Sequence, residues 1–300
     1  MPHKPRSIIP RRKLNWRFKR RYMTIAAGFN FDDGAILCAD TKHTGGMTLY
    51  ETKLFRREYQ NGGKSVFAFS GSSYYAKMAV QKCESAIAKL RNRPTVADIS
   101  GAVESALVKV HRTHIDKHPD RNMEGGPDFL LLAAFWSPVD GLKTFSTSQT
   151  AIVPFDVYDC IGSGNYLGHY IIRPRYRSLG SLLRAVAVAT TALQRIKSYD
   201  SNCGGYSQFI MVTKAGTISE IGIFDIAQKE KFAEEFHEGA EEVYTTMADF
   251  EANDADVEKK FAEFKTSIMI ERAKHQADKD ERERIVKLLS DLGISLRLSK

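Results

Sequence analysis

Hydrophobic positions recur along the chain with two different spacings, which separate predicted strands from predicted helices. Alternating or continuous apolar runs bounded by turn residues predict strands at 25–31, 35–39, 64–71, 129–136 and 142–148, and a strand pair within 208–224. Asp33-Gly34 joins the first two strands as a hairpin turn. Apolar residues spaced three or four apart predict helices at 72–92, after an N-cap at Thr95, after residue 165 and at 181–199.

The order of these elements predicts the fold class. Strands come first, then two helices, more strands, more helices and two final strands. Runs of strands separated by helices favour sheets covered by helices, because a regular βαβ chain would alternate single elements. We therefore predict an α+β fold.

The last part of the chain has a different composition. Residues 229–300 hold 18 acidic and 13 basic residues, together with an apolar stripe at helical spacing. The polar stretch 271–284 interrupts that stripe, which argues against a sustained coiled coil. We predict a charged helical extension that lies on the domain or on a neighbouring subunit.

The positive net charge belongs to a short leader. The formal charge is +8, and residues 1–22 carry nine Lys and Arg and no acid, which leaves −1 for the rest. Residues 1–23 are therefore a basic leader: a propeptide, sequence upstream of the true start, a transit peptide or an arm for an acidic partner. The remaining boundaries are a domain at 24–228 and the extension at 229–300.

Composition also limits the location and the chemistry. No apolar run approaches the ~18 residues of a membrane span, and the four cysteines have no metal-type spacing. We expect reduced thiols, a cytoplasmic protein and no membrane partner. His111, His114 and His118 have helical spacing, but no carboxylate motif accompanies them, so surface histidines at a helix end are favoured over a metal site.

Six short motifs follow one another in an informative order. They are Thr24, Ala39-Asp40, Lys53 in ETKLF, Ser70-Gly71, Gly162-Ser163-Gly164 and the D-x-x-C-G-G stretch at 200–205. Each motif alone also fits an ordinary strand end, turn or helix end. Together and in this order, over about residues 24 to 225, they resemble proteasome β-type subunits and the related bacterial proteasome-like peptidases.

The resemblance implies a fold and a set of site residues. The fold would be an Ntn-hydrolase αββα sandwich of four layers, assembled into rings. Thr24 would be the nucleophile, Lys53 a neighbouring ammonium, Asp40 its counter-ion and the Gly71 N–H the oxyanion donor. Ser163, Asp200 and Cys203 would form a supporting network around the amine of Thr24.

The chemistry of threonine makes the mature N-terminus decisive. A threonine hydroxyl needs a base, and a free α-amine with a pKa of about 7.7–8.0 can serve, whereas a peptide nitrogen cannot. Met23 departs from the glycine that self-processing subunits usually carry. Translation from Met23 followed by methionine removal would free Thr24. Cys203 departs from the family's usual serine, and a thiol is a weaker hydrogen-bond partner, so the network would be looser.

These observations predict an N-terminal-threonine endopeptidase that cleaves polypeptides and needs no cofactor or metal. The resemblance implies that it forms a homo-oligomeric ring. An ATP-dependent unfoldase partner follows from the resemblance alone. Three alternatives stay open: an inactive structural ring subunit with Thr24 unprocessed, an Ntn hydrolase of small amides, and a nucleic-acid-associated protein acting through the leader. Of these, nucleic-acid binding is the least favoured, because the leader is short.

Overall fold

A computed structural model describes residues 24–45, 47–121, 126–176 and 180–291. The predicted leader, residues 1–23, and the Met23 hypothesis lie outside the described residues, and the division of the chain into three parts stays a prediction.

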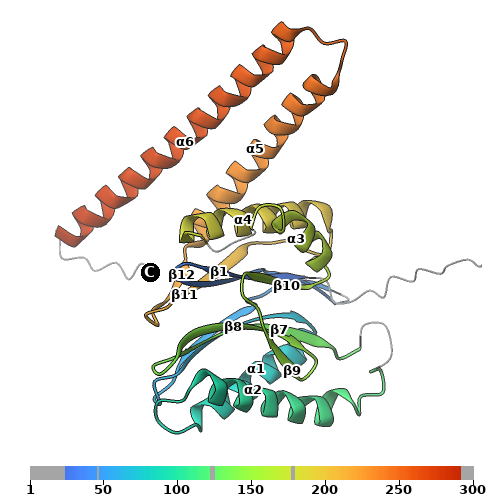
Figure 1. Cartoon of the computed structure of the whole chain (residues 1–300), viewed down its shortest axis with the longest axis vertical. Helices are drawn as coiled ribbons and strands as arrows, with labels where there is room; N and C mark the ends of the chain where they lie inside the picture. The colour runs from blue at the N-terminus through green and yellow to red at the C-terminus, as the bar shows by residue number, and fades with distance from the viewer. Residues whose placement is uncertain (1–23, 46, 122–125, 177–179, 292–300) are drawn as a thin grey trace, which may run out of the picture.

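Two five-stranded antiparallel sheets form the body of the molecule (Figure 1). The first has the strand order β10-β1-β2-β11-β12, with bounds Tyr158–Gly162, Ile25–Phe31, Gly34–Asp40, Ser207–Thr213 and Ile218–Ile221. The second runs in chain order from β5 to β9, with bounds Leu54–Glu58, Lys64–Gly71, Phe129–Ser137, Gly141–Ser148 and Ala151–Pro154. A separate hairpin pairs β3 (Lys42–Gly45) with β4 (Met47–Tyr50).

Helices cover the outer face of each sheet (Figure 1). Helices α1 (Ser73–Ala88) and α2 (Val96–Val110) pack on the second sheet, and α3 (Asn165–Ile172) and α4 (Leu182–Tyr199) pack on the first. The predicted combination of helices and sheets is confirmed, and the sheets are antiparallel.

Three apolar clusters hold these elements together. One lies between the first sheet and α3–α4, one between the second sheet and α1–α2, and one between the two sheets. The cluster between the sheets includes Leu37 from β2, Val66 from β6 and Leu132 from β7, all fully buried. The central strands β2, β6 and β7 are buried on both faces, so their sequences are nearly continuous apolar runs, with β2 buried at every position.

The structure shifts one predicted turn and adds short strands. The first hairpin turns at Asp32-Asp33, with Phe31 facing Gly34, so the turn lies one residue before the predicted Asp33-Gly34. Gly34 instead belongs to β2, where a Cβ would lie 2.2 Å from the Val212 carbonyl oxygen. The added strands β3, β4, β5, β9 and β10 are four or five residues long, too short to show a periodic pattern.

The second helix begins as predicted and ends in an unexpected way. Thr95 and Asp98 form a capping box at its start. At its end a single π-helical turn covers His111–Ile115. The expectation of surface histidines is wrong for His111, which is buried against the ring of Phe129 with centroids 5.3 Å apart. Burial lowers the pKa of His111, which disfavours its charged form.

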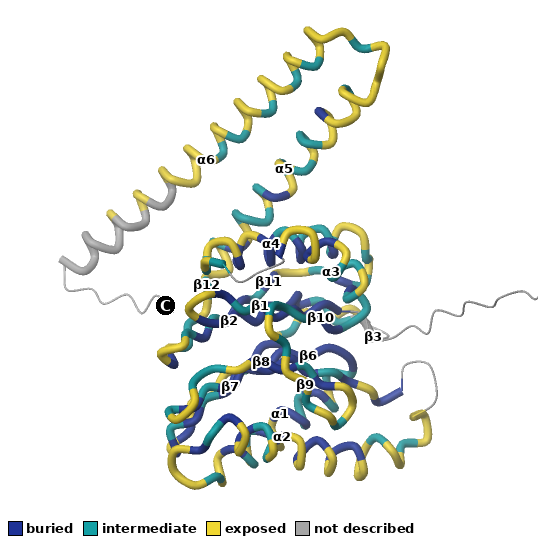
Figure 2. Tube along the Cα trace, viewed as in Figure 1, coloured by how far each residue is buried: buried dark blue, intermediate teal, exposed yellow. Residues whose placement is uncertain are grey.

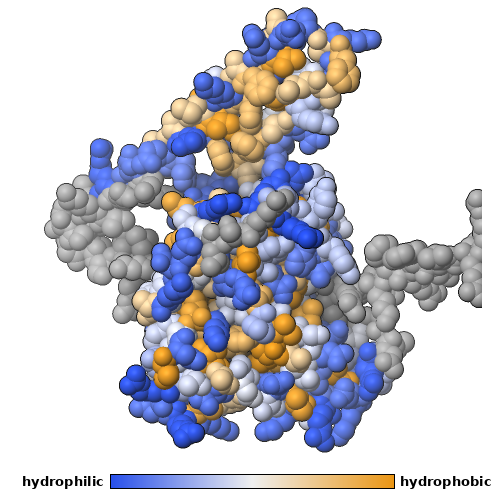
Figure 3. Space-filling view, in the orientation of Figure 1, coloured by the Kyte–Doolittle hydropathy of each residue, from blue (hydrophilic) through white to orange (hydrophobic). Residues whose placement is uncertain are grey.

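A long helical hairpin projects from the body (Figures 1 and 2). Helix α5 (Ile223–Ala248) leaves the first sheet, and α6 (Asp254–Asp291) returns antiparallel to it. The two helices pack where the Phe264 ring lies over Gly239 and beside Phe236. Large apolar side chains such as Phe250 and Met269 stay exposed, and Figure 3 shows apolar residues gathered on one face of the hairpin.

Among the described residues, no helix combines the length and apolar character required to cross a membrane.

Gly162 tests how tightly strand β10 packs on the start of β1. Its φ is +105°, and a Cβ would lie 2.1 Å from the Thr24 carbonyl oxygen. We expect Gly162→Ala to lower the free energy of unfolding by about 2–3 kcal/mol, since strain and a backbone clash add. Chemical denaturation measures this loss.

Gly101 is the matched control, because it lies inside α2 and a Cβ there would have no atom within 4 Å. Gly101→Ala should raise stability by about 0.5–1 kcal/mol. Equal effects of the two substitutions would contradict the close approach at Gly162.

Candidate functional site

Three predicted site residues meet where strand ends of the two sheets come together. Thr24 directly precedes β1, Asp40 ends β2 and Lys53 directly precedes β5 of the other sheet. All three are buried, with exposed fractions of 1% for Thr24 and 0% for Asp40 and Lys53. The site therefore depends on the stacking of both sheets.

The hydroxyl of Thr24 bridges a cation and an anion. Thr24 Oγ1 donates to Asp40 Oδ1 at 2.5 Å and accepts a hydrogen bond from Lys53 Nζ. Lys53 Nζ and Asp40 Oδ1 are themselves 2.7 Å apart. Thr24 Oγ1 is consequently held in one position, beside a positive charge that favours its deprotonated form.

Backbone groups complete the coordination of both charged side chains. Asp40 Oδ1 also accepts from the Ile25 N–H at 3.2 Å, and Asp40 Oδ2 accepts from the Gly204 N–H at 2.8 Å. Lys53 Nζ also donates to the Lys42 carbonyl oxygen. These partners satisfy charges that would otherwise be costly to bury.

Burial and the ion pair act on Lys53 in opposite directions. Loss of solvent lowers the pKa of Lys53, and the Asp40 carboxylate opposes this shift by favouring the ammonium. A lysine with a lowered pKa loses its proton at a pH where an exposed lysine would still be charged. That property is common among functional lysines.

The predicted oxyanion donor lies at the end of strand β6. Gly71 has a φ of +100°, and a Cβ there would lie 2.5 Å from the Asp128 carbonyl oxygen, so the position requires glycine. The side chain of Ser70 lies near Gly162, which in turn contacts the Thr24 carbonyl. This places the Ser70-Gly71 segment close to Thr24, while the role of the Gly71 N–H stays a prediction.

The remaining predicted residues form a second cluster around Asp200. Asp200 Oδ2 accepts from Ser163 Oγ at 3.0 Å and from Cys203 Sγ at 3.6 Å. Asp200 also caps its own loop, because Oδ1 accepts from the Asn202 N–H at 3.0 Å. The long contact from Cys203 agrees with the weaker donor that a thiol provides. The predicted support of the Thr24 nitrogen by this cluster stays a prediction.

Sequence-based prediction missed the backbone groups that bond to Asp40 and Lys53. It also missed four polar residues around the segment that carries Gly204. Thr41 and Lys197 bond to the segment that carries Gly204, and Ser207 at the end of that segment bonds to Lys197 and Glu230. Thr41 directly follows the Ala-Asp motif, so its place in the chain was a usable signal. The other three carry no motif, because their contacts arise only in the folded chain.

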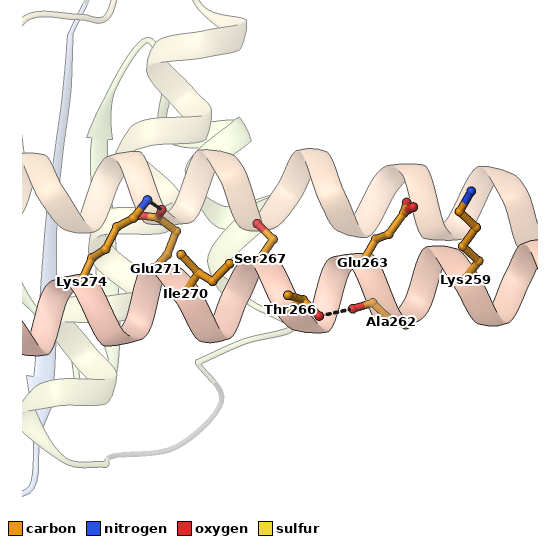
Figure 4. A pocket seen from close by; sticks show the side chains of 8 residues that line it. All are labelled: Lys259, Ala262, Glu263, Thr266, Ser267, Ile270, Glu271 and Lys274. Carbon is orange, nitrogen blue, oxygen red and sulfur yellow. Dashed lines mark hydrogen bonds and ion pairs between the residues drawn. The ribbon is translucent and has the colours of Figure 1, made fainter.

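The site has no metal-binding cluster among the described residues, and the hollow found along helix α6 lies elsewhere. The described part of the chain contains no group of three or more His, Cys, Asp or Glu side chains placed to hold a metal ion. A hollow of about 620 Å³ lies along α6, lined by Lys259, Ala262, Glu263, Thr266, Ser267, Ile270, Glu271 and Lys274 (Figure 4). Its polar side chains partly pair within that one helix, as Glu271 does with Lys274.

Comparison with known proteins identifies the fold. No protein-family model matches the chain, and no curated protein sequence matches it. Solved structures do match. Anbu (ancestral beta-subunit) from Yersinia bercovieri has a TM-score of 0.62 at 13% identity, covering 74% of this chain and 97% of that one.

Two further Anbu structures give the same result. A Gly-1 mutant from Hyphomicrobium sp. strain MC1 has a TM-score of 0.63 at 13% identity, covering 75% of this chain and 100% of that one. The structure described as the helical assembly of the Anbu complex from Pseudomonas aeruginosa has a TM-score of 0.59 at 15% identity, covering 73% and 96%.

These matches correct the family prediction. The fold is that of Anbu proteins, so the prediction of a proteasome β-type subunit or a related bacterial proteasome-like peptidase is wrong. The motifs behind that prediction mark strand ends and turns around one site. Because such positions follow from the fold, they do not separate one branch of related proteins from another.

The four cysteines provide a test of the site's packing. Cys38, Cys83, Cys160 and Cys203 are free and buried, and burial raises the pKa of each thiol. We expect a thiol reagent at pH 8 to label none of them in the native protein during the time in which it labels all four in guanidinium. Mass spectrometry counts the labels. Rapid labelling of Cys203 alone would identify a reactive thiol at the site instead.

Proposed function

We propose that the chain is an N-terminal-threonine hydrolase that cleaves peptide bonds through an acyl-enzyme on Thr24. The observation that supports it most strongly is the Thr24 hydroxyl held between Lys53 and Asp40 in a fully buried cluster. The two stacked sheets with helices on their outer faces support the αββα sandwich of Ntn hydrolases as part of this proposal.

The proposed reaction begins with proton transfer from the hydroxyl. Thr24 Oγ attacks the peptide carbonyl carbon while the free α-amine of Thr24 accepts the hydroxyl proton. Lys53, as an ammonium, stabilises the developing negative charge on Oγ, and Asp40 keeps that ammonium in place. The carbonyl oxygen becomes an oxyanion, for which the Gly71 N–H is the proposed donor.

The second half of the reaction restores the enzyme. The tetrahedral intermediate collapses, the C–N bond breaks and the α-ammonium passes its proton to the leaving amine, which leaves an ester on Thr24. A water molecule then attacks this ester, with the α-amine again as base, and releases the acid. Ser163, Asp200 and Cys203 are proposed to orient the α-amine through their shared hydrogen bonds.

This chemistry requires removal of the residues before Thr24. In the full chain the nitrogen of Thr24 is bonded to Met23 and cannot act as a base. The Thr24 side chain is also buried, so a substrate cannot reach Oγ1 in this arrangement. An unprocessed chain would accordingly be an inactive structural subunit, which is the second candidate function.

Self-assembly is part of the proposal. The Anbu complex from Pseudomonas aeruginosa is described as a helical assembly, and the hairpin of this chain exposes large apolar side chains such as Phe250 and Met269. Exposed apolar patches often mark contacts between proteins. We propose a homo-oligomer, open or closed, in the cytoplasm with polypeptides as substrates.

A peptide epoxyketone tests the reaction, because its adduct needs both the hydroxyl and the free amine of one terminal residue. We expect it to modify a chain that begins at Thr24 and to leave the full-length chain unmodified. Thr24→Ala should abolish the adduct and lower peptide cleavage by about a thousandfold or more. Intact-mass analysis measures both the N-terminus and the adduct.

Thr245→Ala is the matched control, since Thr245 is exposed on α5 and its hydroxyl donates to the Glu241 and Glu242 carbonyl oxygens of the same helix. It should react like the unchanged protein. A purified assembly that keeps residues 1–23 and shows no adduct would leave only the structural subunit. Cleavage of small amides in preference to peptides would support the small-amide hydrolase.

The pH dependence of cleavage tests the role of Lys53. The rate should rise as the α-amine loses its proton, near or below pH 7.7–8.0 because of the adjacent ammonium. It should fall again as Lys53 loses its proton, and burial places this limb below the ordinary lysine pKa of 10.5. Stability measured over the same pH range separates titration from unfolding. An alkaline limb at or above 10.5 would contradict the role of Lys53.

A further inference from the structure

The segment that donates to Asp40 connects α4 with β11. It runs from Asp200 to Ser207 and contains Gly204, whose N–H donates to Asp40 Oδ2 at 2.8 Å. At its start, the bonds of Asp200 to Ser163 and Asn202 hold it in place. The position of the Gly204 N–H therefore depends on what holds the other end.

The segment is bound along its length to the residues that follow Asp40. The Lys42 N–H donates to the Gly204 carbonyl oxygen at 3.0 Å. The Tyr206 N–H donates to Thr41 Oγ1 at 2.9 Å, and the Thr41 N–H donates to the Tyr206 carbonyl oxygen at 3.0 Å. Gly205 lies between them with a φ of +73°, and a Cβ there would lie 2.4 Å from Thr41 Oγ1. This packing leaves the segment little freedom to move without moving Asp40.

Three polar side chains from different elements anchor the far end. Lys197 of α4 and Glu230 of α5 form an ion pair at 2.6 Å, with side-chain exposures of 14% and 15%. Ser207 Oγ donates to Glu230 Oε1 at 2.5 Å. Lys197 Nζ also donates to the Gly205 carbonyl oxygen at 3.1 Å. We name Lys197, Ser207 and Glu230 the anchor cluster.

One member of the anchor cluster, Ser207, is the direct neighbour of Asp40 in the sheet register. Ser207 is the β11 residue opposite Asp40 of β2, and it is 2% exposed. Glu230 accepts from both other members of the cluster. Its removal would leave a cation and a hydroxyl without their common acceptor, in a place where little water could replace it.

We propose that Glu230 and Lys197 are positioning residues that keep the Gly204 N–H in place to donate to Asp40. Through these two residues, the base of the C-terminal hairpin is coupled to the active site. The activity part of this inference rests on the proposed function. Glu230 lies in the second turn of α5, so the hairpin contributes a residue to the support of the site although its tip projects far from it (Figure 1).

Glu230→Gln is the primary variant, because it keeps the shape of the side chain and removes its charge. In protein with a free Thr24, we expect kcat for peptide cleavage and the maximal rate of epoxyketone modification to fall about ten- to a hundredfold. KM should change by less than about threefold, because the anchor cluster does not touch the substrate in the proposed mechanism. Thermal unfolding confirms that the variant is folded at the assay temperature.

Two further variants sharpen the result. Glu234→Gln makes the same change one turn later on α5, at an exposed position, and should leave kcat unchanged. Ser207→Ala removes the two bonds that Ser207 makes to Glu230 and Lys197 but keeps the Lys197–Glu230 ion pair, so it should fold and give a smaller loss of kcat. Unchanged kcat in both Glu230→Gln and Ser207→Ala would overturn the coupling to catalysis.

Amide hydrogen exchange on the full-length chain provides a readout that needs no turnover. The peptide spanning residues 201–207 should exchange faster in Glu230→Gln than in the unchanged chain or Glu234→Gln, while strand β7 keeps its protection. Equal exchange at 201–207 in all three proteins would overturn the anchor itself. If Thr24 proves unreactive but exchange responds as expected, the proposed function fails and the anchor stands.

Discussion

The ion pair between Lys53 and Asp40 is the interaction on which the rest of the site depends. Two charges lie fully buried 2.7 Å apart. The free energy needed to remove two such charges from water can exceed the free energy of their attraction. An apolar pair of similar volume could stabilise such a position equally well. Stability therefore does not explain the pair, whereas its bonds to Thr24 do. Thr24 Oγ1 bonds to both partners, and within the described part of the chain the other bonds of the Asp40 carboxylate come from the Ile25 and Gly204 backbone N–H groups.

The layered fold places these groups by ending strands at one edge. β1 starts just after Thr24 and β2 ends at Asp40, so their antiparallel pairing brings the two residues together. Lys53 comes from the other sheet, and the Phe69 N–H of β6 donates to its carbonyl oxygen at 3.2 Å. The apolar cluster between the sheets fixes the spacing between them. A change in that packing would separate the lysine from its two partners, which links the core to the chemistry.

The sequence predicts the parts of this structure whose signals are local. Helix periodicity, the Thr95 cap and the apolar runs of β6 and β7 reflect the contacts of neighbouring residues, and the structure contains all of them. The Asp-Gly turn was misplaced by one residue because Gly34 is needed for a close approach to β11, which is a tertiary requirement. Glu230 and Lys197 could not be predicted, since each fits an ordinary charged helix and only folding brings them to Ser207.

The comparison of fold and motifs explains why the family prediction failed while the site residues still came together. About a quarter of this chain lies outside each Anbu match, although the matched chains are covered almost completely. The motifs mark strand ends and turns of this fold, where geometry dictates glycine at Gly71 and Gly162. Residues outside the motifs also contribute to the support of this site. Glu230 of helix α5 is such a residue: its charged side chain, near the start of the helix, accepts a hydrogen bond from Ser207, which lies opposite Asp40 in the sheet.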